Sequence, residues 1–218
     1  MLLKPNDNRA WQIGQNEKYF LFFLRSEFIA GIFVGRHLMH RPLRRFSGLT
    51  KYTCNTSLYK NTYLSLMALP NIFTARVADD VISRINKLTP QTSPGWGKMN
   101  VAQMLAHCCV TYEMVYEDKH PKPGLFMKLI LKMLVKNKVV SETPYKHNNP
   151  TAPAFLITGE RDFNTEKNRL IAYIQKTQQL GDKAFDGRES HSFGPLTITE
   201  WSNMFYKHID HHLTQFGC

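Results

Sequence analysis

The segment LTITEWSNMFYKHIDHHLTQFG, residues 196–217, decides the fold because it specifies a helix with a defined start and end. Thr197 and Glu200 have the spacing of a capping box, in which each side chain accepts a hydrogen bond from the other residue's backbone N–H. Gly217 supplies a residue that readily adopts the left-handed conformation with which many helices end. The segment therefore predicts a helix over about 198–216.

One face of this helix combines aromatic and histidine side chains at spacings of three and four: Trp201, Phe205, His208, His212 and Phe216. The two histidines stand one turn apart, where Cβ atoms are about 5–6 Å from each other, so both rings can bind one ion. Three protein ligands around zinc leave a position free for water or substrate. The alternative is that both histidines are hydrogen-bonded core residues, and a metal site needs a third ligand.

A third histidine comes from an earlier segment, NVAQMLAHCCVTYEMVYE, which predicts a helix over 100–117. Asn100 is a plausible N-cap, and Gln103 completes a variant capping box. His107 lies on the side of this helix that also carries Met104. A helix bearing His107 that faces the His-x-x-x-His helix can close a three-histidine site for a divalent metal.

These motifs resemble the DinB/YfiT-like metalloenzyme superfamily, in which one histidine of an early helix accompanies H-x-x-H-H-x-x-Q in the last. The matching residues here are His107, His208, His211, His212 and Gln215. The stretches WGKMNVAQMLAHC, NPTAP and GPLTITEWSNMFYKHIDHHLTQFG are similar, more narrowly, to a family of unknown function within that superfamily, known mainly from bacterial genomes. The resemblance covers about residues 67–218.

The resemblance implies that His107, His208 and His212 ligate the metal and that His211 stays outside the ligand set. It also implies an all-α fold, a four-helix bundle with one long crossover that carries a short extra helix. Three imidazoles suit zinc or nickel, and also iron, manganese, cobalt or copper. The superfamily includes thiol-dependent transferases and isomerases, so the resemblance does not fix a reaction.

Polar residues near the histidines are candidates for orienting the ligand rings, since ligating histidines usually donate their second N–H to such a group. These candidates are His211, Gln103, Glu113, Asp210 and Gln215. The alternative for each is an ordinary surface or capping residue.

Two function classes fit such a site. The first is an enzyme, a metal-dependent hydrolase or thiol transferase acting on a small molecule, which could be a thiol. The second is a non-catalytic protein that binds a metal or ligand as a stress factor or sensor. A homodimer through an exposed helix face is a further expectation.

Charge and composition divide the chain into two parts. The net charge is +11, but residues 1–66 hold ten Lys/Arg against three Asp/Glu, which leaves residues 67–218 mildly basic. Nucleic acid is therefore not an expected partner of the main domain, although residues 1–66 could associate with it. Arg25 and Glu27 interrupt the apolar run near the N-terminus, so no membrane partner is expected. We expect the functional protein to start at Met67; the alternative is a genuine basic or membrane-surface extension.

The rest of the chain predicts helices over 71–88 and 163–180 and a short helix over 125–135. Lys128, Lys132 and Lys136 are expected on a solvated face of that short helix. An irregular crossover over 141–156 either covers the mouth of the site or simply spans the bundle. A glycine-rich loop is expected over 182–195.

The four cysteines form no C-x-x-C pair, so a reduced, cytoplasmic compartment is expected: Cys54, Cys108, Cys109 and Cys218. Cys108 or Cys109, next to His107, is an alternative sulfur ligand. The sequence has neither a glycine-rich phosphate loop nor a nucleophile elbow, which argues against nucleotide hydrolysis and serine-hydrolase chemistry.

Overall fold

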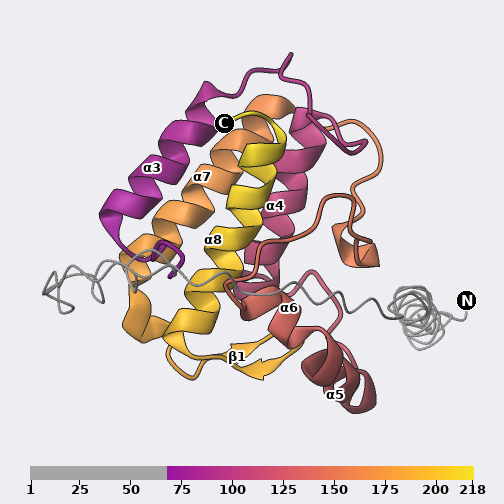
Figure 1. Cartoon of the computed structure of the whole chain (residues 1–218), viewed down its shortest axis with the longest axis vertical. Helices are drawn as coiled ribbons and strands as arrows, with labels where there is room; N and C mark the ends of the chain where they lie inside the picture. The colour runs from indigo at the N-terminus through magenta and orange to yellow at the C-terminus, as the bar shows by residue number, and fades with distance from the viewer. Residues whose placement is uncertain (1–67) are drawn as a thin grey trace, which may run out of the picture.

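The long helices of the described residues run side by side, as Figure 1 shows. They are α3 (Ala75–Lys87), α4 (Val101–Tyr116), α7 (Phe163–Leu180) and α8 (Ile198–Gln215). The computed structural model describes residues 68–218, so the expectations for residues 1–66, including Cys54, lie outside it. Helix α7 packs against α3 and α4, while α8 packs against α3, α4 and the shorter helix α6 (Lys136–Val140).

Shorter elements complete the described part of the chain, which is mostly helical. They are α5 (Leu125–Leu134), the 3-10 helices η1 (Pro153–Phe155) and η2 (Asp182–Ala184), and the antiparallel strands β1 (Glu189–Ser190) and β2 (Gly194–Pro195). The loop expected over 182–195 thus contains a 3-10 turn and a small hairpin. None of the helices in residues 68–218 has both the length and the apolar character needed to cross a bilayer.

Side-chain caps set the limits of the long helices. Thr197 and Glu200 form the predicted capping box of α8, and Asn100 forms that of α4 with Gln103. Helix α3 begins at residue 75 instead of 71, because the hydroxyl of Thr74 accepts from the Val77 N–H and so fixes the first turn.

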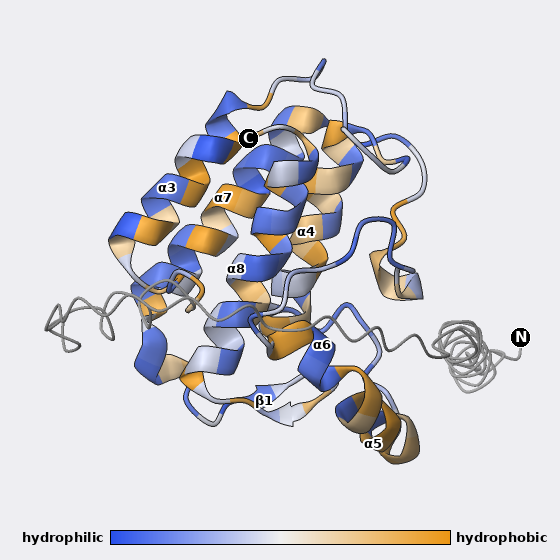
Figure 2. Ribbon diagram, in the orientation of Figure 1, coloured by the Kyte–Doolittle hydropathy of each residue, from blue (hydrophilic) through white to orange (hydrophobic). Residues whose placement is uncertain are grey.

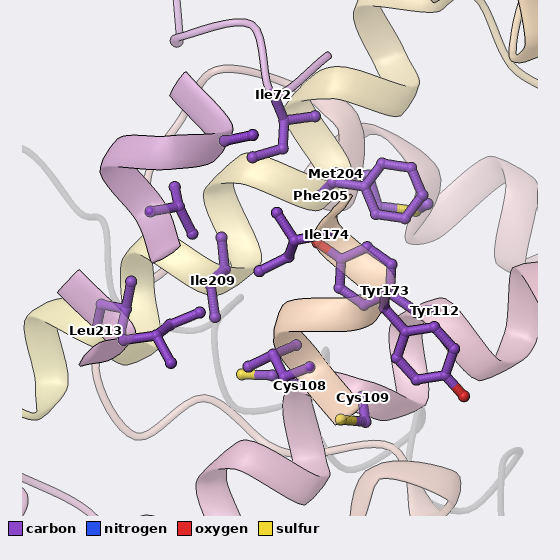
Figure 3. Close-up of a cluster of buried hydrophobic side chains, with 14 of the residues drawn as sticks. Ile72, Cys108, Cys109, Tyr112, Tyr173, Ile174, Met204, Phe205, Ile209 and Leu213 are labelled. Atoms are coloured by element: carbon purple, nitrogen blue, oxygen red, sulfur yellow. The ribbon is translucent and has the colours of Figure 1, made fainter. Parts of the chain in front are cut away.

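Apolar side chains from all four long helices form one core, part of which is drawn in Figure 3. At its centre the ring of Tyr112 lies between those of Tyr173 and Phe205, parallel to each within 6°. The ring centroids are 5.6 and 4.9 Å apart, distances at which stacked aromatic rings attract one another. This core fixes α4 and α8, the two helices that carry the histidines, relative to each other.

The connection from α4 to α7 is fastened to α8 by two buried polar side chains. Lys207 donates to the carbonyl oxygens of Lys138 and Ser141, and Asn203 donates to that of Val140 at 3.0 Å. These carbonyls belong to the C-terminal end of α6, where helices leave backbone acceptors without internal partners. The short helix predicted over 125–135 is therefore followed by a second one, which turns away at Val135 and packs on α8.

Candidate metal centre

Three histidine side chains meet between α4 and α8. His107 lies at the middle of α4, and His208 and His212 lie one turn apart on the facing side of α8. One ring nitrogen from each residue lies within 4.8 Å of the other two, and the Nε2 atoms of His107 and His208 are 3.0 Å apart. Tetrahedral zinc with Zn–N bonds of about 2.0–2.1 Å requires nitrogens about 3.3 Å apart, and the distance between His107 and His208 is close to that spacing.

Each of the three rings uses its Nδ1 atom in a hydrogen bond to oxygen. The Nδ1 of His107 donates to the carbonyl of Phe155 at 2.8 Å, and the Nδ1 of His212 donates to the Gln215 Oε1 at 2.8 Å. Because these acceptors fix the proton on Nδ1, the Nε2 atoms of both rings carry lone pairs. Two ligand atoms are thus prepared for a cation by their hydrogen bonds.

The third ring has a partner that permits either tautomer. Thr111 Oγ1 lies 2.9 Å from the Nδ1 of His208, and a hydroxyl can donate or accept. Without metal, the His208 Nε2–H can donate to the His107 Nε2 across the observed 3.0 Å. If the hydroxyl accepts instead, the His208 Nε2 becomes a third lone pair directed at the same point.

The amide of Gln215 is itself held in place by the loop before α4. Its Nε2 donates to the carbonyl of Trp96, which leaves Oε1 as the atom facing His212. Gly97 has φ of +85°, and a Cβ at this position would lie 2.7 Å from that Nε2. Glycine is therefore required at residue 97 by both its backbone conformation and the approach of Gln215.

Burial keeps the three imidazoles neutral. Desolvation is the largest cause of the lowered pKa of each ring; it takes the pKa of His208 well below 6.5 and that of His212 to about 3. Within the described residues, none of the three rings forms a hydrogen bond with an acidic side chain. At neutral pH the site therefore presents uncharged nitrogen ligands, which a divalent cation can bind without displacing protons.

Of the residues predicted to orient the rings, the structure brings Gln215 to a histidine of the group. His211 packs edge-on against the His212 ring, with centroids 5.1 Å apart, and against Trp96, Tyr145 and His147, but it is not one of the three converging histidines. The other candidates bond elsewhere: Gln103 caps α4 and donates to the Gly159 carbonyl, Glu113 accepts from Arg169 and His120, and Asp210 pairs with Arg84. The acidic residues were poor candidates because arginines from neighbouring helices reach them.

The cysteines next to His107 turn into the core. Cys108 and Cys109 are fully buried among apolar residues, as Figure 3 shows, and neither belongs to the histidine group. Burial raises the pKa of the Cys109 thiol to about 12. Sulfur ligation from these positions does not fit the structure, because the thiolate form that binds metals is disfavoured there.

A cavity of about 1350 Å³ opens beside the histidines. Its walls come from α4, α8, residues 96–99 and the crossover, so the crossover lines the site as well as connecting the helices. Apolar lining residues include Met114, Met204 and Phe155. Among residues 68–218, no Asp or Glu belongs to the lining, whereas four lysines do: Lys98, Lys122, Lys138 and Lys146.

Sequence reasoning missed the residues that orient two of the three rings. Thr111 could have been found, because it lies four residues after His107 and so shares its helix face. The carbonyl groups of Phe155 and Trp96 could not, because any residue type carries one.

The fold and the site define a mostly helical protein with a candidate three-histidine metal centre. Residues 71–217 match the family described as "Protein of unknown function (DUF1569)", and the chain belongs to this family. Comparisons with curated proteins and with solved structures gave no match.

Proposed function

We propose that this protein is a DinB-like metalloenzyme that binds a divalent ion through His107, His208 and His212 and transfers a thiol to a small molecule. The observation that carries the proposal is the convergence of the three rings while each Nδ1 is bonded to an oxygen. Histidines that only pack in a core would not need ring nitrogens that converge on one point. The order of the histidines along the chain, one in an early helix and two in the last, adds the resemblance to that superfamily.

The residues of the chain have separate tasks in this proposal. Gln215, Thr111 and the Phe155 carbonyl orient the ligand rings, and desolvation keeps the rings unprotonated at neutral pH. A divalent ion bound to three neutral imidazoles retains its full charge and supplies Lewis-acid activation of a water or thiol. We propose zinc or nickel as the ion, because imidazole nitrogen is a common ligand of both.

The cavity lining favours thiol transfer over hydrolysis. Among the described residues no carboxylate lines the cavity, so the general base that zinc hydrolases commonly take from a glutamate has no counterpart there. A thiol loses its proton far more easily than water, and the four lining lysines favour an anionic substrate. A small anionic thiol is therefore the substrate class we propose.

Metal analysis by plasma mass spectrometry on protein purified without an affinity tag tests this proposal. We expect about one ion per chain in the wild type and none in His107→Ala or His212→Ala. His211→Ala is the matched control, because this adjacent histidine lies outside the group and the variant should keep the ion. A wild type that binds no zinc or nickel would contradict the proposal.

Activity is tested separately, with a panel of thiols and electrophiles and a panel of esters. We expect metal-dependent thiol consumption that His208→Ala abolishes. A full complement of metal with no turnover on either panel would instead establish the alternative, a non-catalytic metal-binding protein that acts as a sensor or stress factor.

A further inference from the structure

Helix α5 presents its apolar side chains to solvent, and Figure 2 shows this hydrophobic helix projecting from the lower end of the molecule. The exposed fractions are 89% for Leu125, 73% for Phe126, 54% for Leu129 and 73% for Met133. These residues lie within about 100° of one another around the helix, so they form one continuous face. We call these four residues the α5 apolar face. In a monomeric soluble protein, a helix is expected to bury such a face.

Ion pairs on the other side of the helix hold it in this orientation. Lys128 pairs with Glu189 of β1, and Lys136, just after α5, pairs with Glu200 of α8 at 2.7 Å. Met127 and Leu131 are buried on this inner side. The sequence predicts Lys128, Lys132 and Lys136 on a solvated face. Lys132 is exposed as predicted, whereas Lys128 and Lys136 are half-buried in these ion pairs, and the apolar face also points outward.

The charge around α5 indicates what covers its apolar face. Residues 119–141 contain six lysines and no Asp or Glu. Lys122 and Lys132 are exposed at the border of the face. An apolar helix face bordered by lysines is typical of helices that lie in the headgroup region of a membrane, where anionic lipid attracts the lysines.

We propose that the α5 apolar face docks on the surface of an anionic lipid bilayer. Phe126 and its apolar neighbours would enter the boundary between headgroups and acyl chains, while Lys122 and Lys132 would contact lipid phosphates. A second copy of the chain is a poorer occupant, because pairing two α5 segments would bring the exposed Lys122 and Lys132 of both copies together, and residues 119–141 contain no Asp or Glu to offset them. Residues 1–66 are a poorer occupant for the same reason, with ten Lys/Arg against three Asp/Glu.

Docking on this face would also orient the cavity. Leu131 and Val135, on the inner side of α5 and at its end, belong to the cavity lining, as do Pro123 and Lys122 just before the helix. The bilayer would therefore lie beside one wall of the candidate metal centre. This consequence does not depend on the metal, so the docking surface can be tested with metal-free protein.

Vesicle co-sedimentation of the full chain tests the proposal. One set of vesicles contains phosphatidylcholine alone, and the other also contains phosphatidylglycerol. We expect binding to the anionic vesicles, weakened at least about tenfold in the double variant Phe126→Ser/Leu129→Ser, because two large apolar side chains no longer insert. Leu180→Ser is the matched control: this leucine ends α7, is 45% exposed and does not belong to the α5 apolar face, so its loss should leave binding unchanged.

A second variant tests the charge. Lys122→Gln/Lys132→Gln should weaken binding to anionic vesicles and reduce its dependence on salt. Two results would overturn the proposal. One is vesicle binding that Phe126→Ser/Leu129→Ser leaves intact, which would place the lipid contact elsewhere, for example in residues 1–66. The other is a dimer, seen by light scattering, that this variant converts to monomer, which would make a second copy the occupant.

Discussion

Two buried polar side chains of helix α4, His107 and Glu113, lie six residues apart and differ in their partners. Glu113 accepts from Arg169 at 2.8 Å and from His120 at 2.8 Å, so its carboxylate has two hydrogen-bond donors within the protein, one of them a guanidinium. His107, by contrast, faces two other histidines, and no charged side chain of the described residues is hydrogen-bonded to the three rings. Both groups are buried to a similar extent, 6% and 5% exposed.

This difference distinguishes a group of side chains that stabilises the fold from one that can bind a ligand. A buried carboxylate paired with arginine and histidine is complete without a ligand and holds α4 against α7. Three neutral imidazoles with converging nitrogens stabilise one another little, and a bound cation can stabilise them much more. We call Glu113, Glu166 and Arg169 the acid cluster and the three histidines the histidine cluster. The acid cluster should therefore govern stability, and the histidine cluster should govern metal binding.

Arg169→Met gives the largest expected effect and separates the two clusters. Its removal leaves Glu113 and Glu166 without their guanidinium partner, so unfolding in urea should show a loss of about 3 kcal/mol. This is the lower end of the range for breaking a buried pair, because the Arg169 side chain is 33% exposed. The metal content should stay unchanged.

His208→Ala is the reciprocal variant. It should lose the metal yet cost the metal-free chain less than Arg169→Met, because it leaves no buried charge unpaired. Release of metal from Arg169→Met would show that the two clusters are coupled and would contradict their separate roles.

Acid should destabilise the metal-free chain through the histidine cluster. The pKa of His212 is lowered to about 3 by desolvation, whereas in the unfolded chain it is near 6.5. The unfolded state therefore binds the proton first, and the stabilisation present above pH 6.5 is lost as the pH falls towards 3. For His212 alone the loss at pH 5 is about 2 kcal/mol. Urea unfolding of the wild type and His212→Gln at pH 7 and pH 5 checks this. An equal change in the free energy of unfolding between the two pH values in both proteins would contradict it.

Gly97→Ala gives the smallest expected effect and tests the support of the histidine cluster. Its positive φ costs a non-glycine residue about 1–2 kcal/mol, and its Cβ would displace Gln215 from His212. Gly187→Ala is the matched control, with φ of +67° and no atom within 4 Å of the added Cβ. Both variants should lose similar stability, but only Gly97→Ala should weaken metal binding, by about tenfold or more in a calorimetric titration. Equal metal affinity in the two variants would show that Gln215 does not support metal binding.

The helices could be predicted from the sequence because their ends are specified locally. Thr197, Asn100 and Asp162 cap helices within three residues of themselves, and the observed limits of α4, α7 and α8 follow the predicted ones within one residue. Helix α5 was located correctly and Lys132 is exposed as predicted, but the half-burial of Lys128 was not predicted, because its partner Glu189 is 61 residues away.

The candidate site could be predicted in part for the same physical reason. The spacing of His208 and His212 is a local property of one helix, so their meeting on one face follows from the sequence. The arginines that engage Glu113 and Asp210 come from α7 and α3, and the Phe155 carbonyl comes from the crossover. Such contacts depend on how distant segments pack, which one sequence does not specify.

The most direct test of the metal centre is anomalous diffraction from a crystal of the protein soaked in zinc or nickel, recorded at the absorption edge of that metal. We predict one peak between α4 and α8, about 2.0–2.1 Å from the Nε2 atoms of His107, His208 and His212. No peak at this position, or a peak bound through Nδ1 atoms or at other residues, would contradict the assignment of these histidines as the metal centre.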